Sequence, residues 1–207
     1  MNEKPANKHK TRTTETRALL LRAAEEVFVR DGYERAELGE IAELAGRTKG
    51  AIYAHFESKE NIFLALIADR RAKSREMARQ FLNGSSTAEE SRRALREFYL
   101  TLAENPVAPL LTMEFKLFAL RHPESKKRLT EFDAESLAPK DEERIAKILG
   151  PSPSGALSRV DAIRTIHDVL SALSLQAKYD SRPNRSRINR KIIGQIFDAL
   201  IGPSTKP

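Results

Sequence analysis

The chain has 207 residues, of which 40% are hydrophobic and 31% charged, enough for a small domain joined to a larger one with a buried core. It contains no cysteine and no continuous apolar run of transmembrane length. Disulfides, thiolate chemistry and a membrane-spanning helix are therefore excluded, and a protein of the reducing cytoplasm without a secretory signal is expected. The formal net charge of +7 favours a polyanionic partner, and the alternative is a soluble protein that is merely basic.

Residues 1–13 are basic and polar, without apolar periodicity, so the sequence predicts a flexible arm. An arm that precedes a DNA-binding unit can reach phosphates or a groove. Lys10 and Arg12 are therefore candidate DNA contacts, and a solubilising tail is the alternative.

A first helix is predicted from Thr14 to Arg30. Its apolar residues recur at helical spacing and would pack on the two helices that follow. Asp31-Gly32 is expected to end it. The residues of this stripe are Leu20, Ala23, Ala24, Val27 and Phe28.

Residues 37–61 read as two short helices joined by a tight turn. Ile41, Ala42 and Ala45 give the first of them an apolar face. Gly46 suits the left-handed position that ends a helix, and Thr48 can accept a hydrogen bond from the first free N–H groups of the next helix. This spacing is typical of a helix-turn-helix, whose second helix reads DNA.

The stretch from about Thr14 to Phe63 resembles the DNA-binding domain of TetR-family transcriptional regulators. The similarity rests on the segments LLRAAEEVFVRDGY, EIAELAG and TKGAIYAHFESKENIF. The motif residues that match the family pattern are Ala45, Gly46, Thr48, Gly50, Ile52, Tyr53, His55, Phe56, Ser58, Lys59 and Glu60. The resemblance implies a recognition helix around Thr48 to His55.

The side chains of this segment suit DNA contact. Lys49 can reach base acceptors or a phosphate, and Tyr53 can place its ring on a thymine methyl group or donate its hydroxyl to a phosphate. Gly50 would let the backbone approach DNA closely. The alternatives are that Tyr53 is half in the core and that Gly50 is needed for tight packing.

The remaining DNA-contact candidates follow from position and resemblance. Arg47 lies in the turn, where the family usually has a small apolar residue, and is interpreted as an extra contact. By resemblance, His55 and Lys59 contact the phosphate backbone, and Ser58 caps the next helix. The predicted DNA-binding set is Arg47, Thr48, Lys49, Tyr53, His55, Lys59, Lys10 and Arg12.

Besides Arg47, three residues depart from the family pattern. Ala36 and Glu37 stand where the family has a threonine or serine that caps the second helix and touches a phosphate. A carboxylate at residue 37 favours the helix dipole but repels phosphate. Gly39 lies inside the second helix and costs about 1 kcal/mol relative to alanine. These departures keep open a protein that has lost DNA recognition.

The second half of the chain is predicted to be helical throughout. A helix from Ser58 to about Leu82 would join the two halves, and residues 110–120, apolar almost all round, predict a helix buried in the domain. Residues 124–150 predict a broken helix, followed by a loop at 150–155. Two amphipathic helices are expected at 157–179 and 186–201.

The last two helices suit an isologous dimer packed as a four-helix bundle, which is how the family dimerises. The alternative is that both helices face the core of their own subunit. The predicted dimer-interface residues are Ile163, Leu170, Leu173, Ile192, Ile196, Phe197 and Leu200.

The resemblance also implies a small-molecule cavity among the middle helices, although for each candidate the helical spacing favours plain core over a ligand wall. His167 stands out because it shares a helix face with Ile163 and Leu170, and a buried imidazole needs a polar partner. Few polar candidates indicate an apolar or aromatic effector. The candidates are Phe81, Phe98, Tyr99, Met113, Phe118, Phe132 and His167.

The sequence therefore predicts an all-α protein with a flexible arm at 1–13, an N-terminal three-helix helix-turn-helix DNA-binding domain at 14–60 and a larger C-terminal helical ligand-binding and dimerisation domain at 61–207. The expected function is that of a homodimeric regulator of transcription, in particular a repressor released from double-stranded DNA by an effector. No cofactor, metal site, membrane association or enzyme chemistry is expected, since the four histidines lack metal-ligand spacing. Two alternatives remain: a DNA-binding dimer without a ligand, and a helical ligand- or partner-binding dimer without DNA recognition.

Overall fold

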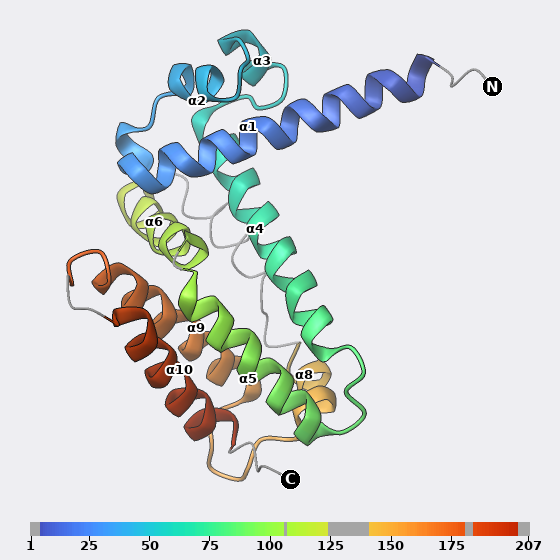
Figure 1. Cartoon of the computed structure of the whole chain (residues 1–207), viewed down its shortest axis with the longest axis vertical. Coiled ribbons are helices and arrows are strands. Elements are labelled where there is room, and N and C mark those ends of the chain that lie inside the picture. Colours follow the sequence, from blue (N-terminus) through green and yellow to red (C-terminus); the bar gives the residue numbers. More distant parts are fainter. Residues whose placement is uncertain (1–4, 106, 124–140, 181–183, 203–207) are drawn as a thin grey trace. The chain divides into compact units, whose positions relative to one another are not determined.

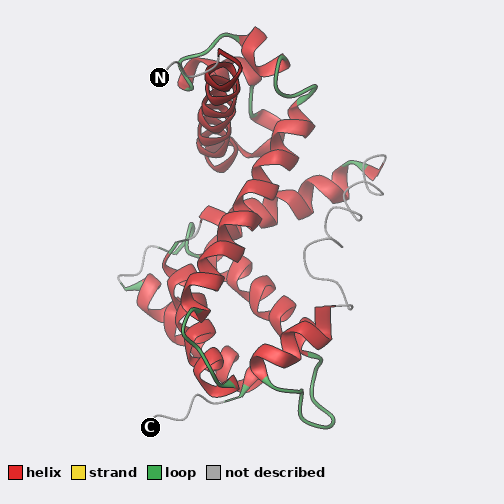
Figure 2. Ribbon diagram, turned by 90° about the vertical axis from the view of Figure 1, so that its right-hand side faces the viewer, coloured by secondary structure: helices red, strands yellow, loops and turns green. Residues whose placement is uncertain are grey.

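The computed structural model describes residues 5–105, 107–123, 141–180 and 184–202. Within these ranges every regular element is a helix, as Figure 2 shows. The prediction of an all-α chain is confirmed. None of the described helices is long and apolar enough to cross a membrane.

The chain divides into two compact units, Met1–Arg70 and Arg71–Pro207. The division falls inside α4 (Lys59–Leu82) rather than at its start. The physical reason is that Ile62, Phe63 and Leu66 in the first half of α4 are buried with the N-terminal helices, as their apolar spacing indicates.

Unit 1 contains α1 (Pro5–Arg35), α2 (Leu38–Leu44) and α3 (Lys49–Tyr53). The prediction of a flexible arm is wrong for residues 5–13, which belong to α1. Proline is compatible with the first turn of a helix, where its missing N–H has no intrahelical partner. Gly32, with φ at 77°, is the non-helical residue near the end of α1, at the position where a break is expected.

The core of unit 1 centres on three aromatic rings from two helices. The Phe28 and Phe63 ring centroids lie 4.9 Å apart, and Tyr33 lies 5.0 Å from Phe63. Burial raises the pKa of Tyr33 to about 12. An ion pair between Arg70 and Glu25 adds a polar link between α4 and α1. The edge-to-face pair of Phe28 and Phe63 thus joins α1 to the first half of α4.

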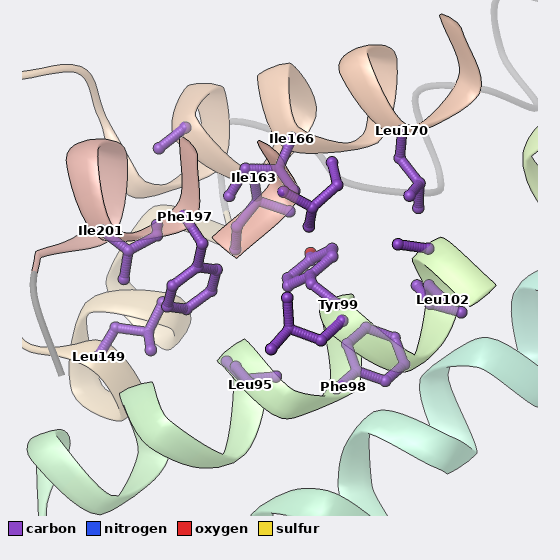
Figure 3. Close-up of a cluster of buried hydrophobic side chains, with 14 of the residues drawn as sticks. Leu95, Phe98, Tyr99, Leu102, Leu149, Ile163, Ile166, Leu170, Phe197 and Ile201 are labelled. Atoms are coloured by element: carbon purple, nitrogen blue, oxygen red, sulfur yellow. The ribbon is translucent and has the colours of Figure 1, made fainter. Parts of the chain in front are cut away.

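Unit 2 contains the remainder of α4 and five described helices. A capping box between Thr87 and Glu90 begins α5. These helices are α5 (Ala88–Glu104), α6 (Val107–Arg121), α8 (Glu142–Leu149), α9 (Arg159–Gln176) and α10 (Arg185–Ile201). Helix α5 packs on α10, and α9 packs on both α6 and α10 (Figure 1). Their apolar faces form one core, part of which Figure 3 shows.

The prediction that residues 110–120 form a wholly buried helix is wrong. One face of α6 is buried through Leu111, Phe115 and Phe118, but Leu120 is 79% exposed. The apolar sequence of a helix does not determine whether other helices are present to cover each of its faces. The broken helix predicted at 124–150 is described only from residue 141, where α8 follows; residues 124–140 lie outside the described ranges.

A buried arginine joins three helix ends in unit 2. The guanidinium of Arg159, 4% exposed, donates to the carbonyl oxygens of Gly150, Pro151 and Ile201 at 3.0, 2.9 and 2.9 Å. The Glu142 carboxylate accepts the N–H groups of Arg159 and of the next residue, both at 2.8 Å. Arg159 thus satisfies carbonyls after α8 and at the end of α10, where no helical donor remains.

Candidate nucleic-acid interface and ligand region

The turn between α2 and α3 is fixed by backbone hydrogen bonds. The N–H of Arg47 donates to Ala42 O at 2.8 Å, and that of Gly46 to Glu43 O at 2.9 Å. This pair of bonds is the Schellman pattern, which needs a left-handed residue at the position of Gly46. Its φ is +62°. The prediction of Gly46 as the turn residue is confirmed.

Helix α3 is anchored by one face and exposed on the other. The Thr48 hydroxyl accepts the N–H of Ala51 at 3.3 Å and so caps the helix. Ile52 and Phe56 are buried, whereas Tyr53 is 53% exposed, which excludes the half-core alternative for Tyr53. Thr48, Lys49 and Gly50 are exposed on the same short helix.

Gly50 has room for a side chain. A Cβ atom built at this residue would meet only the Thr48 hydroxyl oxygen, at the ordinary contact distance of 3.8 Å. Tight packing therefore does not explain a glycine at this helical position, where it costs about 1 kcal/mol relative to alanine.

Lys59 has a different environment from the other predicted DNA contacts. Its ammonium donates to Glu34 O at 3.0 Å and Ala36 O at 3.2 Å, and lies 4.7 Å from the centroid of the Tyr33 ring. Lys59 thus caps the end of α1, and a structural role is evident. A phosphate contact by Lys59 is not supported by this arrangement.

The other predicted contacts are accessible to different degrees. Arg47 is exposed, and its Nη1 donates to Gly46 O at 2.9 Å. His55 is half-buried, with its ring centroid 6.3 Å from that of Phe56. Arg12 is exposed on α1; Lys10 lies in α1, and its side chain is outside the described part of the structure. Ser58 accepts the N–H of Asn61 at 3.1 Å and caps α4 as expected.

The departures from the family pattern have structural consequences. Ala36 is 3% exposed and so has no side chain to offer to a phosphate. Glu37 precedes α2 without a side-chain capping bond. A Cβ at Gly39 would meet nothing within 4 Å, so no packing constraint requires this glycine.

In unit 2, four of the predicted effector residues form a continuous series of rings. The centroids of Phe81 and Phe98 lie 6.0 Å apart, and those of Phe98 and Tyr99 lie 5.0 Å apart. Tyr99 also lies 5.3 Å from His167 and 5.8 Å from Phe197. The series brings together residues of α4, α5 and α9 that are distant in sequence.

The other effector candidates do not join this series in the described residues. Phe118 is buried in α6 and lies 4.5 Å from the His122 ring, and Met113 is half-buried. Phe132 lies outside the described residues. A surface hollow of about 620 Å³ is found elsewhere, between α5 and α10, and no predicted effector residue lines it. Its walls include Arg96, Arg187, Arg190 and Lys191.

The predicted dimer interface is contradicted for three residues. Ile163, Leu170 and Phe197 are at most 9% exposed and lie in the core of their own subunit. Leu173, Ile196 and Leu200 are partly buried against the same core, and Ile192 is also half-buried. From the sequence, the most apolar helix faces are assigned to the dimer interface. In the structure these faces pack in the core of their own subunit. Accessible apolar residues near these helices include Leu175, Tyr179 and Ile188, which are 37%, 80% and 38% exposed.

Two roles were not foreseen from the sequence. Arg159 lies on the same helix face as Ile163, Ile166 and Leu170, and this spacing is a signal that could have indicated its burial. A Cβ at Gly194 would lie 2.8 Å from Nη2 of Arg96, so a side chain at this residue would displace the end of that arginine. Among the described residues, no group of acidic, histidine or cysteine side chains could hold a metal ion.

Comparison with known proteins finds a similarity that is concentrated in unit 1. Residues 20–66 match the family model described as "Bacterial regulatory proteins, tetR family". The transcriptional repressor BepR of Brucella suis is 45% identical over 71 residues, which are 34% of each chain. The transcriptional regulator TtgR of Pseudomonas putida is 48% identical over 58 residues, 28% of each chain. The chain thus spans about a third of the length of the curated relatives that it matches.

Similarity of fold extends over nearly the whole chain. A transcriptional regulator from Rhodococcus sp. Rha1 superimposes with a TM-score of 0.69 at 18% identity, covering 92% of this chain and 99% of that one. The regulator FadR from Bacillus subtilis, solved in complex with stearoyl-CoA, gives a TM-score of 0.63 at 17% identity and covers 90% and 95%. Through residues 20–66 of unit 1, which hold the helix-turn-helix, the chain is similar to the TetR family of bacterial regulatory proteins.

Proposed function

We propose that the protein is a sequence-specific, double-stranded DNA-binding regulator of transcription that acts as a homodimer and, as a repressor, is released by a small-molecule effector. The observation that carries the proposal is the exposed face of α3. Lys49, Gly50 and Tyr53 lie on it, while Ile52 and Phe56 fix the helix from behind. A helix held in this way can enter the major groove with its side chains set for base edges.

The environment of Gly50 supports close approach of the backbone to DNA. A Cβ atom at residue 50 has room in the protein, so packing within the subunit does not require a glycine there. A close approach of DNA to the backbone would require one. Alanine at residue 50 would also favour the helix. Gly50→Ala is therefore expected to fold at least as well as the wild type and yet to bind its operator less tightly.

A dimer would place two copies of α3 on the two halves of an operator. The support is a set of accessible, uncharged side chains at helical spacing on α9, on α10 and on the residues after α9. It consists of Ala172, Leu175, Tyr179, Ile188, Gln195 and Ala199. This face replaces the interface expected from the sequence, and an isologous pairing of it would form a four-helix bundle.

Effector binding is supported by the ring series of unit 2, which is apolar apart from Tyr99 and His167. The fold also accommodates a small molecule in FadR from Bacillus subtilis, which was solved with stearoyl-CoA. An effector that prefers one conformation of the protein would change operator affinity, and DNA would change effector affinity by the same factor.

The test begins with selection of binding sites from a random pool of double-stranded DNA. Fluorescence anisotropy on the selected site then compares the wild type with Lys49→Ala, Tyr53→Phe and Gly50→Ala across a salt series. If Lys49 contacts a base, Lys49→Ala is expected to weaken the free energy of operator binding by about 1–3 kcal/mol. If Lys49 contacts a phosphate, the slope of log affinity against log salt concentration should fall by about one.

Lys147→Ala is the matched control, because it removes one exposed positive charge from α8 in unit 2. Equal losses for Lys49→Ala and Lys147→Ala, with no enrichment of any sequence, would show general attraction to phosphates only. That result would contradict the proposal and favour a ligand-binding dimer without DNA recognition. The carboxylate of Glu37 beside α2, which makes no capping bond, is the observation that favours this second candidate.

A further inference from the structure

Arg17 on α1 lies against the residue that closes α3. Its guanidinium carbon is 5.4 Å from the centroid of the Phe56 ring, which is within the range of a cation–π contact. Phe56 is 5% exposed, and its N–H donates to Ile52 O in α3 at 2.7 Å, so the ring is fixed to the end of that helix. The position of the Arg17 guanidinium is therefore set relative to α3, although the side chain is exposed.

The contact with Phe56 leaves hydrogen-bond donors of Arg17 available. A cation–π contact occupies no hydrogen-bond acceptor, and a guanidinium carries five N–H donors that suit the paired oxygens of an anion. Among the described residues, no carboxylate or carbonyl oxygen pairs with this guanidinium. Lys59 is the contrast, since its ammonium also lies over a ring, that of Tyr33, but donates to two carbonyl oxygens at the end of α1.

Several other arginines of unit 1 have partners within the subunit. Arg30 and Arg70 form ion pairs with carboxylates, and Arg35 and Arg47 donate to backbone carbonyl oxygens. Arg17 is placed by a ring instead, so its position is fixed while its charge is not neutralised by a carboxylate. This combination suits a cation that binds an anion from outside the subunit.

A DNA phosphate is the anion that comes closest to this position when α3 lies in the major groove. The groove is about 12 Å wide, and a helix with its side chains is about 10–12 Å across. Side chains that flank the inserted helix therefore meet the phosphates along the groove edge. Arg17 flanks the end of α3 that carries the exposed Tyr53.

We propose that Arg17 binds a DNA phosphate at the edge of the major groove and that Phe56 positions its guanidinium for this contact. The proposal rests on DNA binding by α3 as proposed above, and it adds a residue of α1, outside the helix-turn-helix. A phosphate contact carries no base information, so Arg17 contributes affinity and fixes the placement of α3 without selecting a sequence.

The experiment compares Arg17→Gln, which removes the charge, with Arg17→Lys, which keeps the charge and loses the planar fork. Arg22→Gln is the matched control, because it makes the same change at another exposed arginine of α1. Fluorescence anisotropy of the full-length proteins is measured on the selected operator and on a scrambled duplex across a salt series.

Arg17→Gln should weaken binding to both duplexes by a similar factor, about tenfold. The slope of log affinity against log salt concentration should fall by about one for each subunit bound. Arg17→Lys should keep the slope with a smaller loss of affinity, and Arg22→Gln should match the wild type. Circular dichroism melting verifies that each variant is folded.

A salt slope that Arg17→Gln leaves unchanged would overturn the proposal, and a lower melting temperature in the same variant would then show that Arg17 only covers Phe56. Equal losses for Arg17→Gln and Arg22→Gln would also overturn it, since they would indicate general attraction. An unchanged slope together with operator selection removes this contact and leaves the regulator in place. Without selection of any sequence the regulator fails, but a slope reduced by Arg17→Gln on the scrambled duplex would still support the phosphate contact.

Discussion

The two units differ in where they keep the side chains that we propose for recognition. In unit 1 the core is built from Phe28, Tyr33 and Phe63, while Lys49 and Tyr53 on α3 face solvent. In unit 2 the candidate residues Phe98 and Tyr99 are themselves part of the core. A DNA-binding helix must present its side chains to solvent. A ligand-binding domain encloses its ligand, so in such a domain the same residues serve both core packing and recognition.

This difference explains why the units are recognised so unequally. The family model matches residues 20–66, where the turn, the cap of α3 and the exposed side chains are close in sequence. The ring series of unit 2 is assembled from α4, α5 and α9. Residues of such a site can change with the ligand as long as the core stays filled, and no short motif records them.

The largest effect is expected from the buried cation of unit 2. Arg159→Met keeps apolar volume but leaves three carbonyl oxygens without their donors, and should lower the free energy of unfolding by about 3 kcal/mol. Urea denaturation measures the loss. Arg164→Met, the same change on the exposed side of α9, is the control and should cost less than about 0.5 kcal/mol. Similar small losses for both variants would show that the Arg159 hydrogen bonds contribute little net stability.

The turn of unit 1 should be the next most sensitive position. Gly46 has a φ of +62°, and a Cβ atom at this residue would have nothing within 4 Å, so Gly46→Ala isolates the cost of the backbone conformation. The expected loss is about 1–2 kcal/mol. Hydrogen exchange of the α2 and α3 amides should report it. Unchanged protection in both helices would mean that the turn adopts another conformation at little cost.

A change of opposite sign is expected in the helix that precedes this turn. Gly39→Ala in α2 meets no atom within 4 Å and should stabilise the protein by about 1 kcal/mol. Together with Gly46→Ala it forms a matched pair, because the two substitutions are identical and only the backbone conformation differs. Thermal melting of both variants in parallel provides the measurement, and a lower melting temperature for Gly39→Ala would contradict the expectation.

The smallest effect concerns pH. Burial lowers the folded-state pKa of His167 below its ordinary value of 6.5, so between those two pKa values the unfolded chain binds more protons than the folded one. The contribution of His167 to the free energy of unfolding should be fully present above about pH 6.5 and should decline as the pH falls through the folded-state pKa. The charged groups that act on the imidazole are Asp168, Arg71 and Lys116.

His167→Gln should remove this part of the pH dependence. Urea denaturation of both proteins between about pH 7 and pH 5.5, which brackets the ordinary histidine pKa, is expected to show a steeper decline for the wild type, with the difference growing as the pH falls. Parallel decline in the two proteins would indicate that His167 is protonated equally easily in the folded and unfolded states.

The sequence by itself was sufficient for the features that depend on near neighbours. Helical periodicity and the capping residues Thr48 and Ser58 predicted α3 and α4, and Gly46 predicted the turn, because each rests on hydrogen bonds within a few residues. The all-α class followed from the same periodicity. The family resemblance came from the same short segment.

Only the tertiary structure decided which apolar faces are covered. It placed Ile163, Leu170 and Phe197 in the core of the subunit, exposed Leu120, and turned Lys59 towards the end of α1. It also set the buried Arg159 against the ends of other helices and brought Tyr99 beside His167. Local patterns reveal that a side chain seeks burial or a partner, but the partner is supplied by elements far along the chain, whose packing is chosen by the whole core.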